Sequence, residues 1–252
     1  MAMALILPKI SNVERNSMGI LTASDWLAIK LTLQLALVTT FILLIIGPII
    51  AWWLAHGQSR FRSMIEAVVA IPLILPPTVL GFYLLIAFSP NSFIGNFWLQ
   101  LTGSTLTFTF QGLVIGSVLY SLPFMVQPLQ AAFSQLDIKL LQAASSMGAN
   151  RWDQFCHLII PLTRRSFLIA TSMAFAHTVG EFGVVLMIGG NIPGETQVLS
   201  IALFDHVESL NYQQAHWLAG ILLVFSFLLL WLLYSLQRNN QLANRSSTYV
   251  KF

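Results

Sequence analysis

Long apolar stretches separated by short polar segments run through this chain. Five of them reach the length of about 20 residues that a helix needs to cross a bilayer. They cover Trp26–Leu54, Met64–Phe88, Phe108–Phe133, Ser166–Gly189 and Ala215–Leu236. The first is the longest and fits a helix that tilts or extends past the interface. The pattern predicts an all-α polytopic membrane protein with about five transmembrane helices.

Prolines interrupt two of these stretches. Pro72, Pro76 and Pro77 fall in the second stretch, and Pro123 and Pro128 fall in the third. Each proline removes a backbone donor, which a membrane tolerates where neighbouring helices or a water-lined cavity satisfy the freed carbonyls. Kinked helices suit a transport pathway or gate, and bending for packing alone explains any one proline equally well.

The polar segment between the third and fourth stretches, residues 137–165, has the pattern of two short helices. Apolar residues recur in its first half at helical spacing: Leu140, Ala143, Ala144 and Met147. Gly148 then permits a sharp turn, where we expect a side chain to collide with the turn or with a facing subunit. Asn150 is suited to cap the second helix.

This second short helix carries an aromatic face. Trp152, Phe155 and Ile159 fall on one side of it, and Pro161 prevents its straight continuation. A helix-turn-helix with an exposed aromatic stripe between membrane spans is typical of a docking element. An ordinary amphipathic helix at the membrane surface is the alternative.

The same segment resembles the coupling loop of binding-protein-dependent ABC importer permeases. That loop reads Glu-Ala-Ala, three residues, Gly, and further on Leu-Pro; this chain has Gln142-Ala143-Ala144, Gly148 and Ile160-Pro161. The resemblance implies the type I ABC importer permease fold. It also implies that an ATP-binding subunit is contacted by Gln142, Ala143, Ala144, Gly148, Arg151, Trp152, Phe155 and Pro161. Gln142 replaces the family's Glu, which puts a salt bridge to the partner in doubt and leaves docking in place.

Composition supports a membrane protein and excludes several other classes. Hydrophobic residues make up 56% of the 252 residues and charged residues 8%, with a mean hydropathy of +0.77. Soluble domains carry about 25% charged residues, so no separate soluble enzyme domain is expected. The single Cys156 excludes an intrachain disulfide. Met1–Ile10 is too short to span and lacks the features of a signal peptide.

Basic residues predict the orientation of the chain. Nine of the twelve Lys and Arg residues lie on one side of the predicted spans: Arg60, Arg62, Lys139, Arg151, Arg164, Arg165, Arg238, Arg245 and Lys251. The positive-inside rule makes that side cytoplasmic. The resemblance to importer permeases implies a bacterial or archaeal cytoplasmic membrane. We therefore expect an external segment over residues 1–25, a permease domain over 26–237 and a cytoplasmic tail over 238–252. The basic character reflects topology, and no nucleic-acid partner is expected.

Glu181 is the ionisable residue placed deepest in a predicted span. A carboxylate near the middle of a transmembrane helix is expensive and usually faces a cavity or the bundle interior. Glu181 is thus a candidate gate or dimer contact, or else a packing carboxyl with His177 as partner. Glu66 lies near the cytoplasmic interface and is interpreted as structural.

The segment from His177 to Thr196 resembles the corresponding segment of molybdate ABC permeases. It includes Gly180-Glu181-Phe182-Gly183 and Gly190-Asn191-Ile192-Pro193-Gly194-Glu195-Thr196. Sulfate permeases share its first part and usually diverge in the loop that follows. We expect the turn to form part of an external docking loop: Asn191, Pro193, Gly194 and Glu195.

The resemblance implies a transmembrane channel-forming subunit of an ATP-driven importer for molybdate or a similar tetrahedral oxyanion. Two copies of this chain would form the pathway, with two ATP-binding subunits on the cytoplasmic side and an external binding protein delivering the ligand. The chain has no phosphate-binding loop, so ATP and Mg²⁺ are expected on the partner, and no cofactor, metal or catalytic residue is expected here.

A dianion cannot cross low dielectric without solvation, so the pathway is expected to be wet and lined by neutral polar groups. The candidates are Thr78, Ser117, Ser121, Gln127, Ser172 and Thr178, together with Glu181. A sulfate or tungstate permease is the nearest alternative. An ion-coupled secondary transporter would usually need more spans and internal repeats. A membrane-embedded enzyme would need acidic and histidine side chains gathered at one depth.

Overall fold

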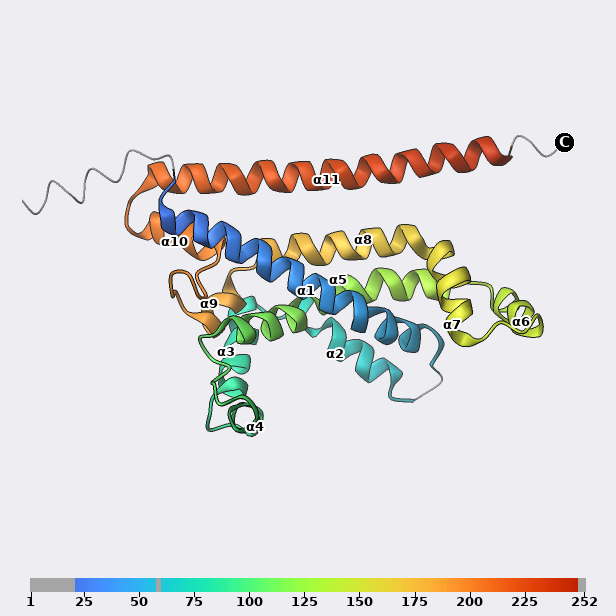
Figure 1. The fold of residues 1–252 in the computed structure, drawn as a ribbon, viewed down its shortest axis with the longest axis horizontal. Coiled ribbons are helices and arrows are strands. Elements are labelled where there is room, and N and C mark those ends of the chain that lie inside the picture. Colours follow the sequence, from blue (N-terminus) through green and yellow to red (C-terminus); the bar gives the residue numbers. More distant parts are fainter. Residues whose placement is uncertain (1–20, 58–59, 249–252) are drawn as a thin grey trace, which may run out of the picture.

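Helices form every regular element in the described part of the chain, residues 21–57 and 60–248 of a computed structural model. The order along the chain is α1 Ala23–His56, α2 Arg62–Ile74, α3 Pro77–Phe88, α4 Phe93–Thr102, α5 Phe110–Ser134, α6 Ile138–Ser146, α7 Arg151–Gln154, the π-helical turn Phe155–Ile159, α8 Ile160–Val179, α9 Gly183–Gly189, α10 Leu199–Glu208 and α11 Tyr212–Thr248 (Figure 1). The predicted all-α class is confirmed.

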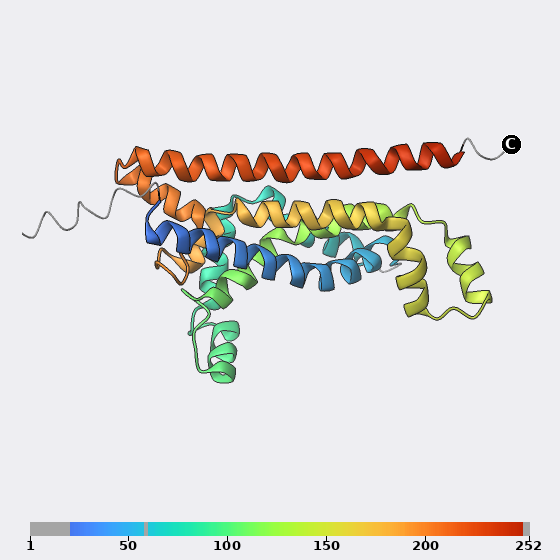
Figure 2. The same ribbon diagram turned by 45° about the horizontal axis from the view of Figure 1, so that its top comes forward.

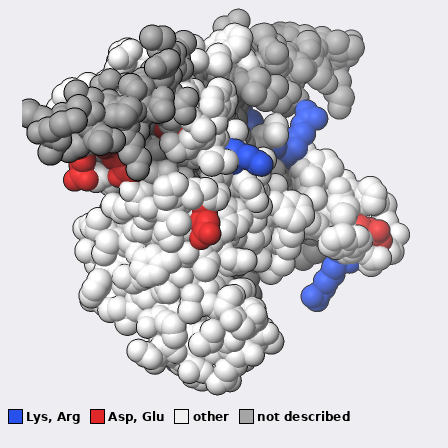
Figure 3. All heavy atoms as spheres, turned by 60° about the vertical axis from the view of Figure 1, so that its left-hand side comes forward, with Lys and Arg blue, Asp and Glu red and all other residues white. Residues whose placement is uncertain are grey.

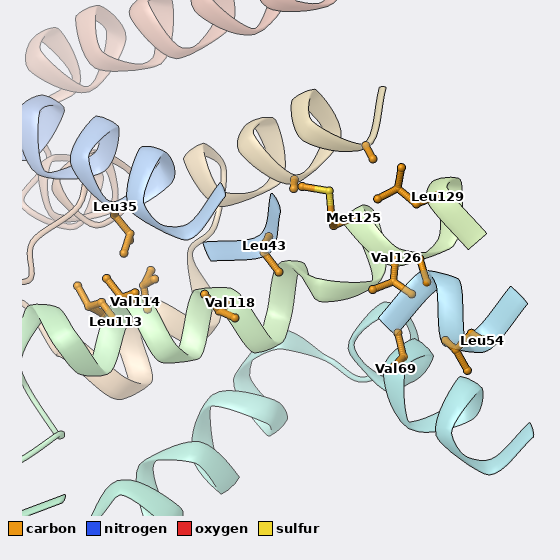
Figure 4. Close-up of a cluster of buried hydrophobic side chains, with 14 of the residues drawn as sticks. Leu35, Leu43, Leu54, Val69, Leu113, Val114, Val118, Met125, Val126 and Leu129 are labelled. Carbon is orange, nitrogen blue, oxygen red and sulfur yellow. The ribbon is translucent and has the colours of Figure 1, made fainter. Parts of the chain in front are cut away.

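The core lies where α1 packs against α5 and α8. Figure 4 shows Leu35 and Leu43 of α1 directed toward α5, where Met125 and Leu129 belong to the same cluster. These side chains are almost fully removed from solvent. Because they occupy one side of long, continuously apolar helices, the remaining sides stay exposed. Figure 3 shows one broad face with few charged side chains, as expected for a surface in lipid.

Four helical segments are each long and apolar enough to cross a membrane: Ala23–His56, Phe110–Ser134, Arg151–Val179 and Tyr212–Trp231. The pair α2 and α3 makes a fifth if it counts as one bent span. The predicted number of about five spans is therefore confirmed. The expected segment over residues 1–25 falls largely outside the described residues, and residues 238–248 continue α11.

The second span is broken in two, which is a sharper change than the kink that its prolines predict. The axes of α2 and α3 differ by 116°. Leu75 and Pro76 have extended backbone, and Pro77 opens α3 at a position where its missing N–H costs no hydrogen bond. As a result α3 leaves the direction of the bundle, as Figures 1 and 2 show.

The fourth span differs from the prediction at both ends. The helical segment begins at Arg151 and ends at Val179, and α9 starts only after an interruption at Gly180–Phe182. The predicted span Ser166–Gly189 is therefore wrong as one continuous helix. Pro161 and the π-helical turn before it mark the point where the chain changes direction between α7 and α8, as Figure 2 shows.

The loop between α9 and α10 and the α6–α7 segment lie at opposite ends of the molecule. Figures 1 and 2 place α10 and the beginnings of α1 and α11 at one end, and α6, α7 and the end of α11 at the other. This arrangement follows from an odd number of crossings. It keeps the α6–α7 segment and the C-terminal end on the same side.

A buried threonine of α1 caps α10. Thr32 Oγ1 accepts a hydrogen bond from Leu199 N at 2.7 Å and donates one to Ala28 O at 2.8 Å. Nearby, Asp25 completes a capping box with Thr22 and pairs with His206 Nε2 at 2.9 Å. Together these contacts fix the start of α1 against α10.

We expect Thr32→Val to lower the free energy of unfolding by about 1–3 kcal/mol, because it leaves the Leu199 amide buried without an acceptor. The measurement is the thermal unfolding midpoint of the purified protein in detergent. Thr102→Val is the matched control, because Thr102 is exposed on α4 and its hydroxyl bonds only locally. Equal midpoints for the two variants would contradict the capping role of Thr32.

Candidate functional site

Two helix-terminal contacts shape the α6–α7 segment. Asn150 caps α7 as predicted: its Oδ1 accepts from Asp153 N at 2.8 Å, and Asp153 Oδ2 accepts from Asn150 N at 3.3 Å. Gln154 joins the two short helices, since its Nε2 donates to Ser145 Oγ at 2.8 Å and to Ala149 O at 3.0 Å. The segment is thus a folded unit with a defined surface.

Gly148 is required by its backbone conformation. Its φ of +88° lies in the left-handed region that side chains rarely adopt. A Cβ built at this position meets nothing within 4 Å. The expected collision with the turn is therefore wrong, and the turn needs glycine for its dihedral angles alone.

The exposed apolar side chains of this segment lie mainly on α6 and the turn. Met147 is 83% exposed, and Ile138 and Leu140 are about half exposed. Gln142 and Ala143 are also exposed, whereas Ala144 is half-buried. This surface belongs to a charged, solvated segment and has no partner within the described chain.

The predicted aromatic stripe, Trp152, Phe155 and Ile159, faces the C-terminal half of α1. Trp152 and Phe155 stack with ring centroids 5.9 Å apart. Together with Arg151 they line a groove of about 670 Å³ whose other wall is formed by α1 residues Leu44, Ile45, Pro48, Ile49 and Trp52. Phe155 is half-buried against the main core, while Trp152 remains 71% exposed. Pro161 is exposed at the start of α8.

Two of the predicted pathway residues, Ser121 and Thr178, meet His177 in a buried hydrogen-bonded group. Ser121 Oγ lies 2.9 Å from His177 Nδ1 and 3.0 Å from Thr178 Oγ1. Thr178 Oγ1 donates to Ala174 O. All three contacts are satisfied together when Ser121 donates to Thr178 and accepts from His177 Nδ1–H. The structure thus brings Ser121 and Thr178 into direct contact. His177, the other partner of Ser121, also stacks on Phe124 at a centroid distance of 3.9 Å.

Glu181 and Thr78 line one pocket of about 430 Å³ with Tyr120 and His177. Glu181 is 4% exposed, and neither of its carboxyl oxygens has a hydrogen-bond partner. Ser117 Oγ is also buried, on α5, and is the side-chain group close enough to interact with the Glu181 carboxyl. Tyr120 was not among the predicted pathway residues. Its position next to Ser121 and one turn before Phe124 was the signal in the sequence that could have identified it. The predicted pairing of Glu181 with His177 is not formed.

The other two predicted pathway residues lie elsewhere. Gln127 lines a separate pocket of about 260 Å³ toward the C-terminal end of α5, beside Gln130, which donates to Glu66 Oε1 at 2.8 Å. Ser172 is half-buried on α8 and lines neither pocket. Within the described residues, no group of three or more His, Cys, Asp or Glu side chains is arranged to hold a metal ion.

The predicted external loop is held by its own side chains. Asn191 Nδ2 and Gln197 Nε2 both donate to Asp205 Oδ2, at 2.5 and 3.0 Å. Thr196 Oγ1 donates to Gly189 O at 2.7 Å. Asn191 therefore fixes the loop to α10, and Pro193, Gly194 and Glu195 form its exposed tip.

Relatives of known role match most of the chain. A protein of Azotobacter vinelandii described as molybdenum transport system permease protein ModB is 55% identical over 218 residues, which is 86% of this chain and 96% of the relative. The protein of that description from Escherichia coli strain K12 is 34% identical over 75% of this chain and 83% of its own length. A sulfate transport system permease protein CysT of the same strain is 32% identical, covering 83% and 76%.

Solved structures match the fold. A bacterial ABC transporter involved in the import of the acidic polysaccharide alginate contains a chain that aligns with a TM-score of 0.69 at 14% identity, covering 94% of this chain and 90% of that one. The MetNI methionine ABC transporter in inward-facing conformations aligns with a TM-score of 0.63 at 15% identity, covering 84% and 94%.

The family model described as "binding-protein-dependent transport system inner membrane component" matches residues 44–241. This range includes the α6–α7 segment, the Glu181 pocket and the external loop. The chain belongs to the family of binding-protein-dependent transport system inner membrane components.

Proposed function

We propose that this chain is the channel-forming subunit of an ATP-driven importer of molybdate. The observation that carries this proposal is the 55% identity over 86% of the chain to a molybdenum transport permease. Identity to the sulfate permeases is lower, at 32%. Tungstate is close to molybdate in size and charge, so we expect both dianions to be carried.

The proposed assembly has two copies of this chain, two ATP-binding subunits and an external binding protein. The fold supports it, because the matched structures are ABC importers and one of them was solved with its periplasmic protein bound. The sequence has no phosphate-binding loop. Hydrolysis therefore falls to the ATP-binding subunits, whose closure acts on the α6–α7 segment.

The decisive test of this function is uptake into proteoliposomes that contain the permease, its ATP-binding subunit and the external binding protein. We expect molybdate accumulation that requires ATP and all three components, with tungstate as an effective competitor and sulfate as a weaker one. Accumulation that is driven by an ion gradient without the ATP-binding subunit would instead identify a secondary transporter.

For docking, we propose that the exposed side chains of α6 and its turn insert into the ATP-binding subunit, with Trp152 at the edge of the contact. Met147→Asp and Trp152→Asp should each lower ATP-driven uptake more than about tenfold, because charge would enter a desolvated contact. Insertion and folding should be unchanged. Thr102→Asp, on exposed α4, is the control. Normal uptake by both α6–α7 variants at equal expression would disprove this docking surface.

The α6–α7 end is proposed to be cytoplasmic and the α10 end external, in agreement with the positive-inside rule. In cells with a permeable outer barrier, a membrane-impermeant maleimide should label Cys156 only after the cytoplasmic membrane is opened. Pro193→Cys in a Cys156→Ser background should be labelled in intact cells. The reverse pattern would overturn the orientation.

A further inference from the structure

The two helix breaks lie against each other and share one pocket. The start of α3 packs against the start of α9, and the two helices make extensive contact. The pocket of about 430 Å³ between them receives Pro77 and Thr78 from α3, Tyr120 from α5 and the linker Gly180–Gly183. Broken helices inside membrane transporters commonly place half-helix ends at the substrate.

The end of α3 that faces this pocket is its N-terminus, where one backbone N–H is free to bind a ligand. Val79 N and Leu80 N both donate to Pro76 O, at 3.0 and 3.2 Å. Among the described residues, no acceptor bonds the Thr78 N–H. A Cβ at Gly183 would lie 3.2 Å from Thr78 N, so the missing side chain leaves this amide accessible. First-turn N–H groups and the helix dipole together favour an anion.

Glu181 provides the second, independent feature. Its carboxyl is buried in the pocket without a hydrogen-bond partner. The main chain around it is fixed, since Ser200 Oγ donates to Glu181 O at 2.5 Å. An ionised carboxylate is costly to bury without partners, whereas the neutral acid carries a proton that it can donate. In the neutral form, Glu181 can donate this proton to a ligand that enters the pocket.

The remaining polar side chains of the pocket are uncharged. The hydroxyls of Thr78 and Tyr120 line it. His177 is committed to Ser121 through Nδ1, and its ring is held between Tyr120 and Phe124. Tyr120 and His177 are the other titratable groups that face Glu181, and no Lys or Arg lines the pocket. A site that offers an anion only partial charges and hydroxyls, without Lys or Arg, binds it weakly. Weak binding suits a site that must release its ligand.

We propose that this pocket is a transient binding site for the tetrahedral oxyanion, in which the N-terminus of α3 and the Thr78 hydroxyl hold the anion while protonated Glu181 donates a hydrogen bond to it. This inference rests on the proposed function. It assigns Glu181 the role of a donor rather than a structural or repelling carboxylate. Loss of the Glu181 proton would replace a donor with a like charge, so uptake should fall as pH rises.

The test uses the complete transporter in proteoliposomes and measures initial molybdate uptake together with ATPase stimulation by the loaded binding protein. Glu181→Leu removes the donor and should lower uptake at least about tenfold, since a hydrogen bond to a charged ligand contributes about 1.5–3 kcal/mol. Glu181→Gln keeps an N–H donor and should retain uptake within about twofold of the unmodified protein. Its uptake should also lose the decline with rising pH.

Thr78→Val removes the hydroxyl with little change in shape and should lower uptake several-fold, with Thr102→Val as the unaffected control. ATPase stimulation should persist in all variants, because docking and coupling occur elsewhere. Unchanged uptake in Glu181→Leu, or in Thr78→Val if Glu181→Leu fails to assemble, would overturn the site. Equal loss in Glu181→Gln and Glu181→Leu would overturn the donor role. Absence of ATP-driven uptake in the unmodified transporter would instead refute the proposed function.

Discussion

A bilayer offers no water to backbone groups that a helix break sets free, so each break must find partners within the protein. Two such breaks interrupt spans in the described part of the chain, at Leu75–Pro76 and at Gly180–Phe182. They are placed side by side, and α3 and α9 cover each other. Because of this pairing, a helix N-terminus, a buried carboxyl and several hydroxyls come together where continuous helices would have kept them apart.

The α1–α5–α8 core supports both ends of the molecule. The segment Arg151–Val179 runs without a helical gap from the α6–α7 segment to the edge of the Glu181 pocket. Its π-helical turn and Pro161 allow α7 to lie across the end of the bundle. The α6–α7 segment therefore has a direct helical connection to the pocket.

Span number, helical class and the docking turn could be predicted from local information. The turn at Gly148 and the cap at Asn150 depend on neighbouring residues in the chain, and both were found. The aromatic stripe was harder to interpret. Spacing correctly placed Trp152 and Phe155 near each other, but it could not reveal that α1 forms the opposite wall of their groove.

The sequence by itself determined the membrane class, the spans and the motifs, because apolar run length and turn chemistry are local properties. It marked Thr78, Ser121, Thr178 and Glu181 as unusual polar residues in apolar surroundings. Only the tertiary structure decided that Thr78 joins Glu181, that Ser121 binds His177, and that Gln127 belongs to another pocket. The reason is that these groupings depend on where two helices break and how the broken ends pack. Contacts between residues far apart in the sequence control both.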